Sequence, residues 1–67
     1  MRLALTKRQT DVVLLIEKRK SYPEIARELG ISQSTVRTHI DLVAAQLPWP
    51  HLPPKARIIH YLESGGA

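Results

Sequence analysis

The 67-residue sequence contains no cysteine, which excludes disulfides and thiolate zinc sites and is typical of proteins from a reducing compartment. Its three histidines, His39, His51 and His60, follow no spacing that a compact metal site requires, so we expect neither a metal nor a cofactor. The longest apolar run, Val12 to Ile16, is far too short to cross a membrane. The amino terminus also lacks the apolar core of a signal peptide. These absences predict a soluble, cytoplasmic protein.

The sequence also lacks the residue patterns that catalysis requires. It contains no nucleophile–base constellation, no pair of carboxylates suited to acid–base work and no glycine-rich phosphate loop. A chain of this length buries only about 60% of its unfolded surface, which is too small a core to enclose a substrate. We therefore expect a protein that is not an enzyme, built as one domain over residues 1–67 and helped by self-association.

The chain does contain an excess of positive charge. Ten Lys and Arg residues stand against six Asp and Glu residues, giving a net charge of +4. A basic excess on so small a domain favours a polyanionic partner, with nucleic acid ahead of an anionic membrane surface.

Capping signals divide the chain into helices. Thr6 with Gln9, and Ser21 with Glu24, have the S/T-x-x-E/Q form of a capping box, which marks the start of a helix. Gly30 suits the left-handed residue that ends the second of these helices. The predicted fold is all-α, with four helices at about residues 7–18, 23–29, 33–47 and 54–63.

The third predicted helix has two different sides. One side is an apolar seam with the spacing of a core-facing stripe, formed by Val36, Ile40, Val43 and Leu47. The opposite side carries Ser34, Arg37, Thr38, Asp41 and Ala45, all but Arg37 short side chains.

Pro48 forbids continuation of this helix beyond residue 47. Residues 48–54 hold four of the five prolines and predict an extended, stiff connector, with Trp49 packed on the core.

Residues Glu24 to His39 have the layout of a helix-turn-helix, in which the second helix enters the major groove of DNA. Hydroxyl groups and free backbone N–H groups at the amino end of that helix suit phosphate contacts. The stretch from Leu5 to Leu47 resembles the DNA-binding domain of the LuxR/GerE-type regulators. The resemblance rests on Leu5-Thr6-x-Arg8-Gln9 and on Glu24-Ile25-Ala26-x-x-Leu29-Gly30-Ile31-Ser32-x-x-Thr35-Val36-x-x-His39.

The resemblance implies a four-helix domain that reads DNA with its third helix and dimerises through its last. Together with the exposed side of the third helix, it defines three sets of expected site residues. The base contacts are Ser34, Arg37, Thr38 and Asp41. The phosphate contacts are Ser32, Gln33, Thr35, Tyr22, Lys55 and Arg57. The dimer contacts are Ile58, Ile59, Tyr61 and Leu62.

Three departures from the LuxR/GerE pattern affect these expectations. Arg19 stands where the family usually has glycine, which predicts that the first helix ends by a different kind of turn. Gln46 replaces a common lysine. Asp41 is acidic on a face that meets DNA, where it either accepts from a cytosine amino group or lowers non-specific affinity.

The leading hypothesis is a homodimeric, sequence-specific regulator of transcription that binds double-stranded DNA. We expect it to be encoded by a bacterium or a phage and to associate with the bacterial nucleoid. The alternative is a protein-interaction module that binds RNA polymerase, a sigma factor or another regulator through the same surface. Region 4 of sigma factors shares the Leu-Thr opening and the helix-turn-helix, but the Thr-Val-x-x-His signature favours the LuxR type. Whether the chain is a stand-alone regulator or a domain excised from a larger one stays open at this stage, as does its operator.

Overall fold

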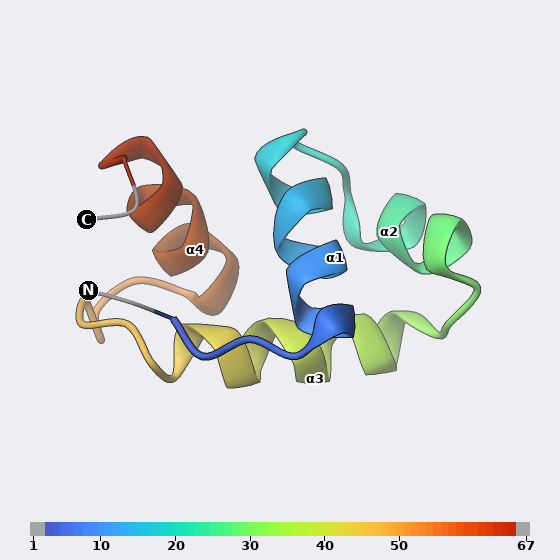
Figure 1. Ribbon diagram of the computed structural model, residues 1–67, viewed down its shortest axis with the longest axis horizontal. Coiled ribbons are helices and arrows are strands. Elements are labelled where there is room, and N and C mark those ends of the chain that lie inside the picture. The colour runs from blue at the N-terminus through green and yellow to red at the C-terminus, as the bar shows by residue number, and fades with distance from the viewer. Residues whose placement is uncertain (1–2, 66–67) are drawn as a thin grey trace.

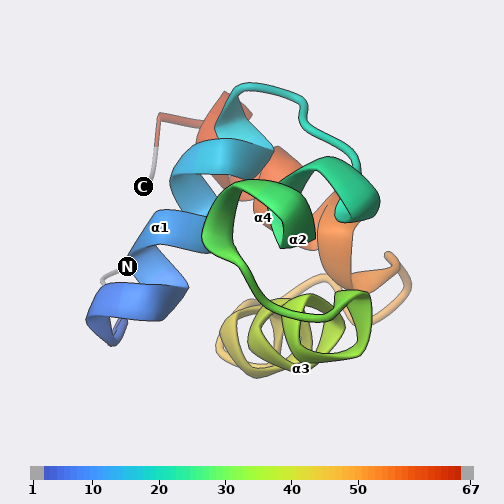
Figure 2. The ribbon, with the colours of Figure 1, turned by 90° about the vertical axis from the view of Figure 1, so that its right-hand side faces the viewer.

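The computed structural model describes residues 3–65, which form an all-helical fold without strands, as predicted. Its four helices are α1 (Lys7–Glu17), α2 (Tyr22–Leu29), α3 (Gln33–Ala44) and α4 (Pro54–Glu63). The longest helix, α3, lies along one edge of the molecule, and the other helices pack on the same side of it (Figure 1). The view along its axis in Figure 2 shows that the other side of α3 faces away from the rest of the fold.

Both predicted capping boxes are present. The Gln9 backbone N–H donates to the Thr6 hydroxyl (3.1 Å), while the Thr6 N–H donates to the Gln9 side chain (3.0 Å). Ser21 and Glu24 form the same reciprocal pair at 3.3 and 2.8 Å. Each box satisfies two backbone donors that a helix start leaves without a partner, which explains why α1 and α2 begin where they do.

The first helix ends by a left-handed turn at Arg19, whose φ is 61°. The Arg19 N–H donates to the Ile16 carbonyl (2.8 Å) and the Lys20 N–H donates to the Leu15 carbonyl (3.1 Å), which is the Schellman pattern. The expectation that Arg19 forces a different kind of turn is therefore wrong. Arginine adopts the backbone conformation that glycine would adopt, at a conformational cost, and its guanidinium pairs with Glu63 at 3.3 Å. Gly30 ends α2 in the same left-handed conformation, as predicted (φ 66°).

The third helix ends at Ala44 and not at residue 47 as predicted. After Ala44 the chain tightens, because the Gln46 and Leu47 N–H groups donate to carbonyls three residues back (3.1 and 3.0 Å). Leu47 stays buried even so, with 7% of its surface exposed, so that all four residues of the predicted seam belong to the core.

The proline-rich connector is folded into turns, which contradicts the expected extended segment. The Leu52 N–H donates to the Trp49 carbonyl (3.0 Å), and Trp49 itself has a positive φ of 37°. The Trp49 ring is partly buried against the core, as predicted, and meets the His60 ring edge to face with centroids 4.3 Å apart. Arg57 of α4 stabilises the folded connector, because its Nε donates to the Leu52 carbonyl (2.8 Å).

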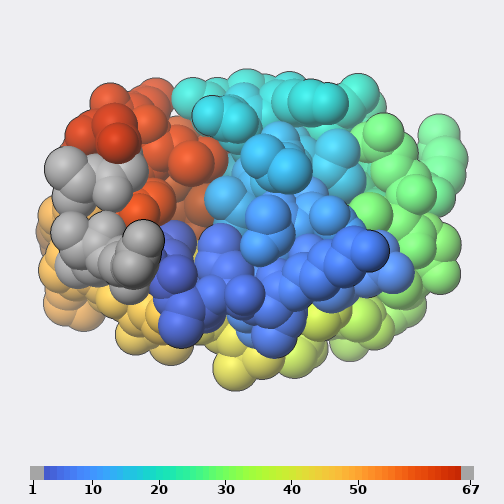
Figure 3. Space-filling view, in the orientation of Figure 1, coloured from blue at the N-terminus to red at the C-terminus, as the bar shows by residue number. Residues whose placement is uncertain are grey.

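The segment before α1 runs along the flank of α3 (Figure 1). In the space-filling view, the amino-terminal part of the chain covers this flank of the helix (Figure 3). Leu3 and Leu5 pack against the core there, which leaves the outer side of α3 free. None of the helices in residues 3–65 is both long and apolar enough to span a bilayer.

Candidate nucleic-acid interface

The free side of α3 carries the residues that the sequence analysis expected at the bases. We define the recognition face as these four expected base contacts, Ser34, Arg37, Thr38 and Asp41, together with Ala45 directly after the end of α3; all five are exposed. The Thr38 hydroxyl donates to the Ser34 carbonyl one turn back (3.1 Å), and this bond fixes the Thr38 rotamer. Apart from Arg37, the face is short-chained and allows close approach to another surface.

The amino end of α3 is organised by Ser32 and Thr35. The Thr35 N–H donates to the Ser32 hydroxyl (3.0 Å), and the two hydroxyl oxygens lie 2.9 Å apart. Ser32 therefore caps the helix, as predicted, but both side chains and Gln33 remain exposed. Capping and phosphate contact are compatible here, because Ser32 caps the helix with an oxygen lone pair, whereas a hydroxyl contacts phosphate by donating its hydrogen. The bond between the two hydroxyls uses only one of their two hydrogens, and the positive end of the helix dipole lies beside the other.

Tyr22, at the start of α2, brings together side chains from two other helices. The Arg37 guanidinium carbon lies 5.9 Å from the centroid of its ring, and the Lys55 Nζ lies 5.3 Å from it. Both distances are within the range of cation–π attraction. Three expected contact residues thus meet at one edge of the recognition face. Tyr22, Gln33, Ser34 and Arg37 also line a shallow hollow of about 200 Å³.

A positive and a negative side chain, Arg37 and Asp41, both act on the Tyr22 phenol. The pKa of the Tyr22 phenol is raised, mainly by partial burial; Arg37 opposes the shift and Asp41 adds to it. Tyr22 is therefore a neutral phenol at neutral pH that lies within electrostatic range of both charged residues of the recognition face. Lys55 is also fixed by a hydrogen bond, since its Nζ donates to the Lys20 carbonyl (3.3 Å).

Arg57 has a structural environment that the sequence did not reveal. Beyond the bond to Leu52, its two terminal nitrogens donate to the carbonyls of Ala44 and Pro50, each at 3.4 Å. Its guanidinium closes the end of α3 onto the connector, and a phosphate would have to compete with these carbonyls. Lys55 is the better placed of the two expected phosphate contacts on α4.

The four expected dimer contacts on α4 differ in their exposure: one is buried and three are partly exposed. Ile58 is completely buried in the core of its own chain, so its assignment to a dimer surface is wrong. The apolar residues of α4 occupy more than one side of the helix, and the sequence pattern did not show which side packs inward. Ile59, Tyr61 and Leu62 are partly exposed and pack against the rim of the core.

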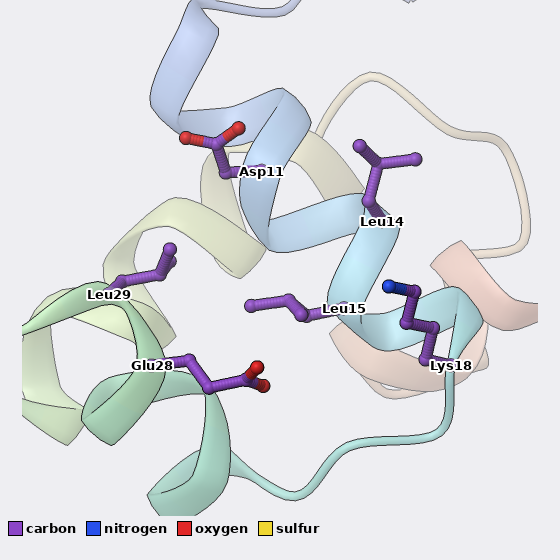
Figure 4. Close-up of a pocket in the computed structure, with 6 residues that line it drawn as sticks. All are labelled: Asp11, Leu14, Leu15, Lys18, Glu28 and Leu29. Atoms are coloured by element: carbon purple, nitrogen blue, oxygen red, sulfur yellow. The ribbon is translucent and has the colours of Figure 1, made fainter.

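A second surface feature, which the sequence analysis missed, is a hollow of about 260 Å³ between α1 and α2 (Figure 4). Leu15 and Leu29 point toward each other across it, and Leu14 at its edge is 50% exposed. The signal was an apolar run on α1 wider than one core-facing stripe requires. No residue of α3 lines this hollow. Its lining consists of Asp11, Leu14, Leu15, Lys18, Glu28 and Leu29.

The tight turn at Gly30, the capped α3 and its exposed polar face define a helix-turn-helix domain of the DNA-binding class. Residues 3–47 match the family model described as sigma-70, region 4, and the chain belongs to this family. The match spans α1, α2 and α3 and ends before the connector and α4. Neither the curated proteins nor the solved structures contained a match. The helix-turn-helix prediction is thus confirmed, whereas its assignment to the LuxR/GerE type is not.

Proposed function

We propose that the protein is a non-enzymatic, sequence-specific regulator of transcription that inserts α3 into the major groove of double-stranded DNA. The observation that carries this proposal is the recognition face, exposed as a unit on a helix whose opposite side is buried in the core. The major groove is about 12 Å wide and admits a helix whose outward side chains are short. Membership of the sigma-70 region 4 family supports contact with DNA.

In this proposal the recognition face contacts bases, and the residues around it contact phosphates. Ser34, Arg37, Thr38 and Asp41 face the base edges. Phosphate contacts come from the amino end of α3 (Ser32, Gln33 and Thr35) and from Tyr22 and Lys55 at its side. This division follows the general rule that phosphate contacts fix the docking register while base contacts supply the sequence preference.

We further propose that two copies bind paired half-sites, because one recognition helix contacts too few base pairs to select a promoter. The resemblance to the LuxR/GerE type supports dimerisation through α4. With Ile58 buried, the proposed contacts are Ile59, Tyr61 and Leu62. A dimer with twofold symmetry reads a symmetric site whose half-sites lie about one helical turn of DNA apart.

Selection of bound duplexes from a random-sequence DNA pool, at two salt concentrations, tests both proposals. We expect enrichment of a motif with twofold symmetry, and binding whose log affinity falls with log salt by about 0.9 for each phosphate neutralised. Enrichment of a motif without symmetry would reject the homodimer and keep the DNA-binding function. No enrichment at either salt concentration would reject the function itself.

A second candidate function, contact with RNA polymerase or another regulator, is favoured by the hollow between α1 and α2. Its exposed Leu14 and apolar floor fit a partner that presents an apolar side chain, and it does not overlap the recognition face. A comparison of two variants, Leu14→Asp and Arg37→Glu, distinguishes the two functions. We expect the first variant to lose capture of purified RNA polymerase and to retain DNA binding, and the second to do the reverse. Loss of both activities in both variants, with folding intact, would contradict two separate surfaces.

A further inference from the structure

Two opposite charges on the recognition face lie one helical turn apart without pairing. Arg37 and Asp41 are four residues apart on α3, a spacing at which helix side chains are neighbours. The ion pairs among residues 3–65 nevertheless include neither of them. The Arg37 guanidinium lies instead over the ring of Tyr22 from the neighbouring helix.

Tyr22 is well suited to hold this guanidinium. It is the first residue of α2 and lies inside the capping box of Ser21 and Glu24, directly before Pro23, so its backbone is fixed on both sides. Its ring is partly buried, and Lys55 contacts it from α4. Because the phenol stays neutral, the ring attracts cations through its face without a negative charge of its own.

We propose that Tyr22 is a positioning residue for base recognition: by holding Arg37 against its ring, it keeps the Asp41 carboxylate unpaired, so that Arg37 reads guanine and Asp41 reads cytosine. In the major groove, guanine offers the acceptors N7 and O6, which a guanidinium binds in bidentate fashion. Cytosine offers its N4 amino group, which a carboxylate accepts. This inference rests on the proposed function, since it assigns bases to the recognition face.

The geometry also limits where the two bases lie. Side chains four residues apart on a helix have Cβ atoms about 5–6 Å apart. Base pairs rise by about 3.4 Å, so the guanine and the cytosine belong to adjacent base pairs or to pairs separated by one. An Arg37–Asp41 ion pair would have to break before either group reached its base, which would weaken binding and blur both preferences.

Four variants of the 67-residue chain test this inference by selection from the same random duplex pool. Tyr22→Leu removes the ring, and Tyr22→Phe is the matched control that keeps it. We expect Tyr22→Leu to weaken binding to the wild-type motif about tenfold, in the range that one bidentate base contact provides, and to blur the guanine and cytosine positions together. Tyr22→Phe should retain both preferences, while loss of the phenol hydroxyl and its phosphate contact lowers the affinity for all sequences alike.

Asp41→Asn supplies the decisive comparison. Alone, it should lose the cytosine preference and keep guanine. In the double variant Tyr22→Leu/Asp41→Asn, the guanine preference should return, because Arg37 then has no carboxylate to pair with. A merely structural role for Tyr22 would not produce this rescue. Circular dichroism confirms that each variant is folded before its motif is compared.

Two results would overturn the inference. If Tyr22→Leu blurs the guanine position equally with and without Asp41, Tyr22 does not act by separating the two charges. If the wild-type motif contains no guanine and cytosine at the stated spacing, the base assignment is wrong. Both results differ from a failure of the proposed function, in which the wild-type chain enriches no motif.

Discussion

The side-chain amide of Gln46 forms two hydrogen bonds with the backbone of Ala4. The Ala4 N–H donates to the Gln46 Oε1 (2.8 Å), and the Gln46 Nε2 donates to the Ala4 carbonyl (2.9 Å). The pair fastens the segment before α1 to the chain just beyond α3, across 42 residues of sequence. A lysine, which the LuxR/GerE pattern often places here, could donate to the carbonyl but could not accept from the N–H.

We expect Gln46→Ala to lower the free energy of unfolding by about 1–3 kcal/mol, because each of the two bonds contributes roughly 0.5–1.5 kcal/mol. Gln46→Lys should recover at most half of this loss. Gln33→Ala is the matched control, since it removes the same side chain from an exposed position of α3. Thermal unfolding followed by circular dichroism gives the comparison. Equal stabilities for Gln46→Ala and Gln33→Ala would show that the fastening adds nothing.

The two left-handed helix ends predict effects of opposite sign. Arg19→Gly should stabilise the fold by up to about 1 kcal/mol, because the strain at φ 61° disappears while the exposed pair with Glu63 contributes little. Gly30→Ala should destabilise it by about 1 kcal/mol. A Cβ at Gly30 meets nothing within 4 Å, so this cost is purely conformational.

Urea unfolding of these two variants, with Arg19→Ala as a control that keeps the strain and removes the charge, measures both effects. Arg19→Ala should be no more stable than the wild-type chain. A loss of stability in Arg19→Gly would mean that the guanidinium contacts outweigh the backbone strain.

The capping box of α2 predicts a pH dependence. The pKa of the Glu24 carboxyl is lowered from its ordinary value of 4.5, chiefly by the hydrogen bonds from the Ser21 backbone and hydroxyl. Since the folded-state pKa is the lower one, the carboxylate stabilises the fold above pH 4.5, and this contribution is lost as the pH falls through the folded value.

Glu24→Gln should therefore flatten the fall in stability on acidification below pH 4.5. Glu28→Gln, which removes an exposed carboxylate of the same helix outside the cap, should leave that fall steep. Unfolding midpoints measured between neutral and acidic pH make the comparison. Identical pH profiles for the wild-type chain and Glu24→Gln would contradict the assignment.

The contacts of Arg57 separate a structural arginine from a phosphate-binding one. We expect Arg57→Lys to lower the free energy of unfolding by about 2 kcal/mol, because a compact ammonium cannot serve three carbonyls at once. In Arg57→Ala, which removes the charge, the salt dependence of DNA binding should stay unchanged. Lys55→Ala should instead reduce the slope of log affinity against log salt by about 0.9. A reduced slope in Arg57→Ala would return this residue to the phosphate contacts.

Most of the fold could be predicted because its determinants are local. The Thr6 and Ser21 caps, the Gly30 turn and the apolar seam of α3 depend on residues three or four positions apart. The end of α3 and the course of the connector could not be predicted in the same way. Both depend on Arg57, which reaches the Ala44 carbonyl from 13 residues further along the chain.

The candidate site follows the same division. The recognition face could be predicted from helical spacing alone, because one seam of α3 is buried and the opposite side is therefore exposed. The contact of Arg37 and Lys55 with the Tyr22 ring could not, since it joins three helices in space. The burial of Ile58 depends on how α4 docks, and nothing in the spacing of its apolar residues distinguishes Ile58 from Ile59.

The folded connector has a practical consequence for spectroscopy. Trp49 is the single tryptophan of the chain, and its ring rests against His60 of α4 beyond the end of α3. Its fluorescence therefore reports on the docking of α4, and Trp49 itself is not part of the recognition face. Unfolding can be followed by this intrinsic emission while DNA binding is followed by a label on the duplex, so that the two processes can be observed separately in one cuvette.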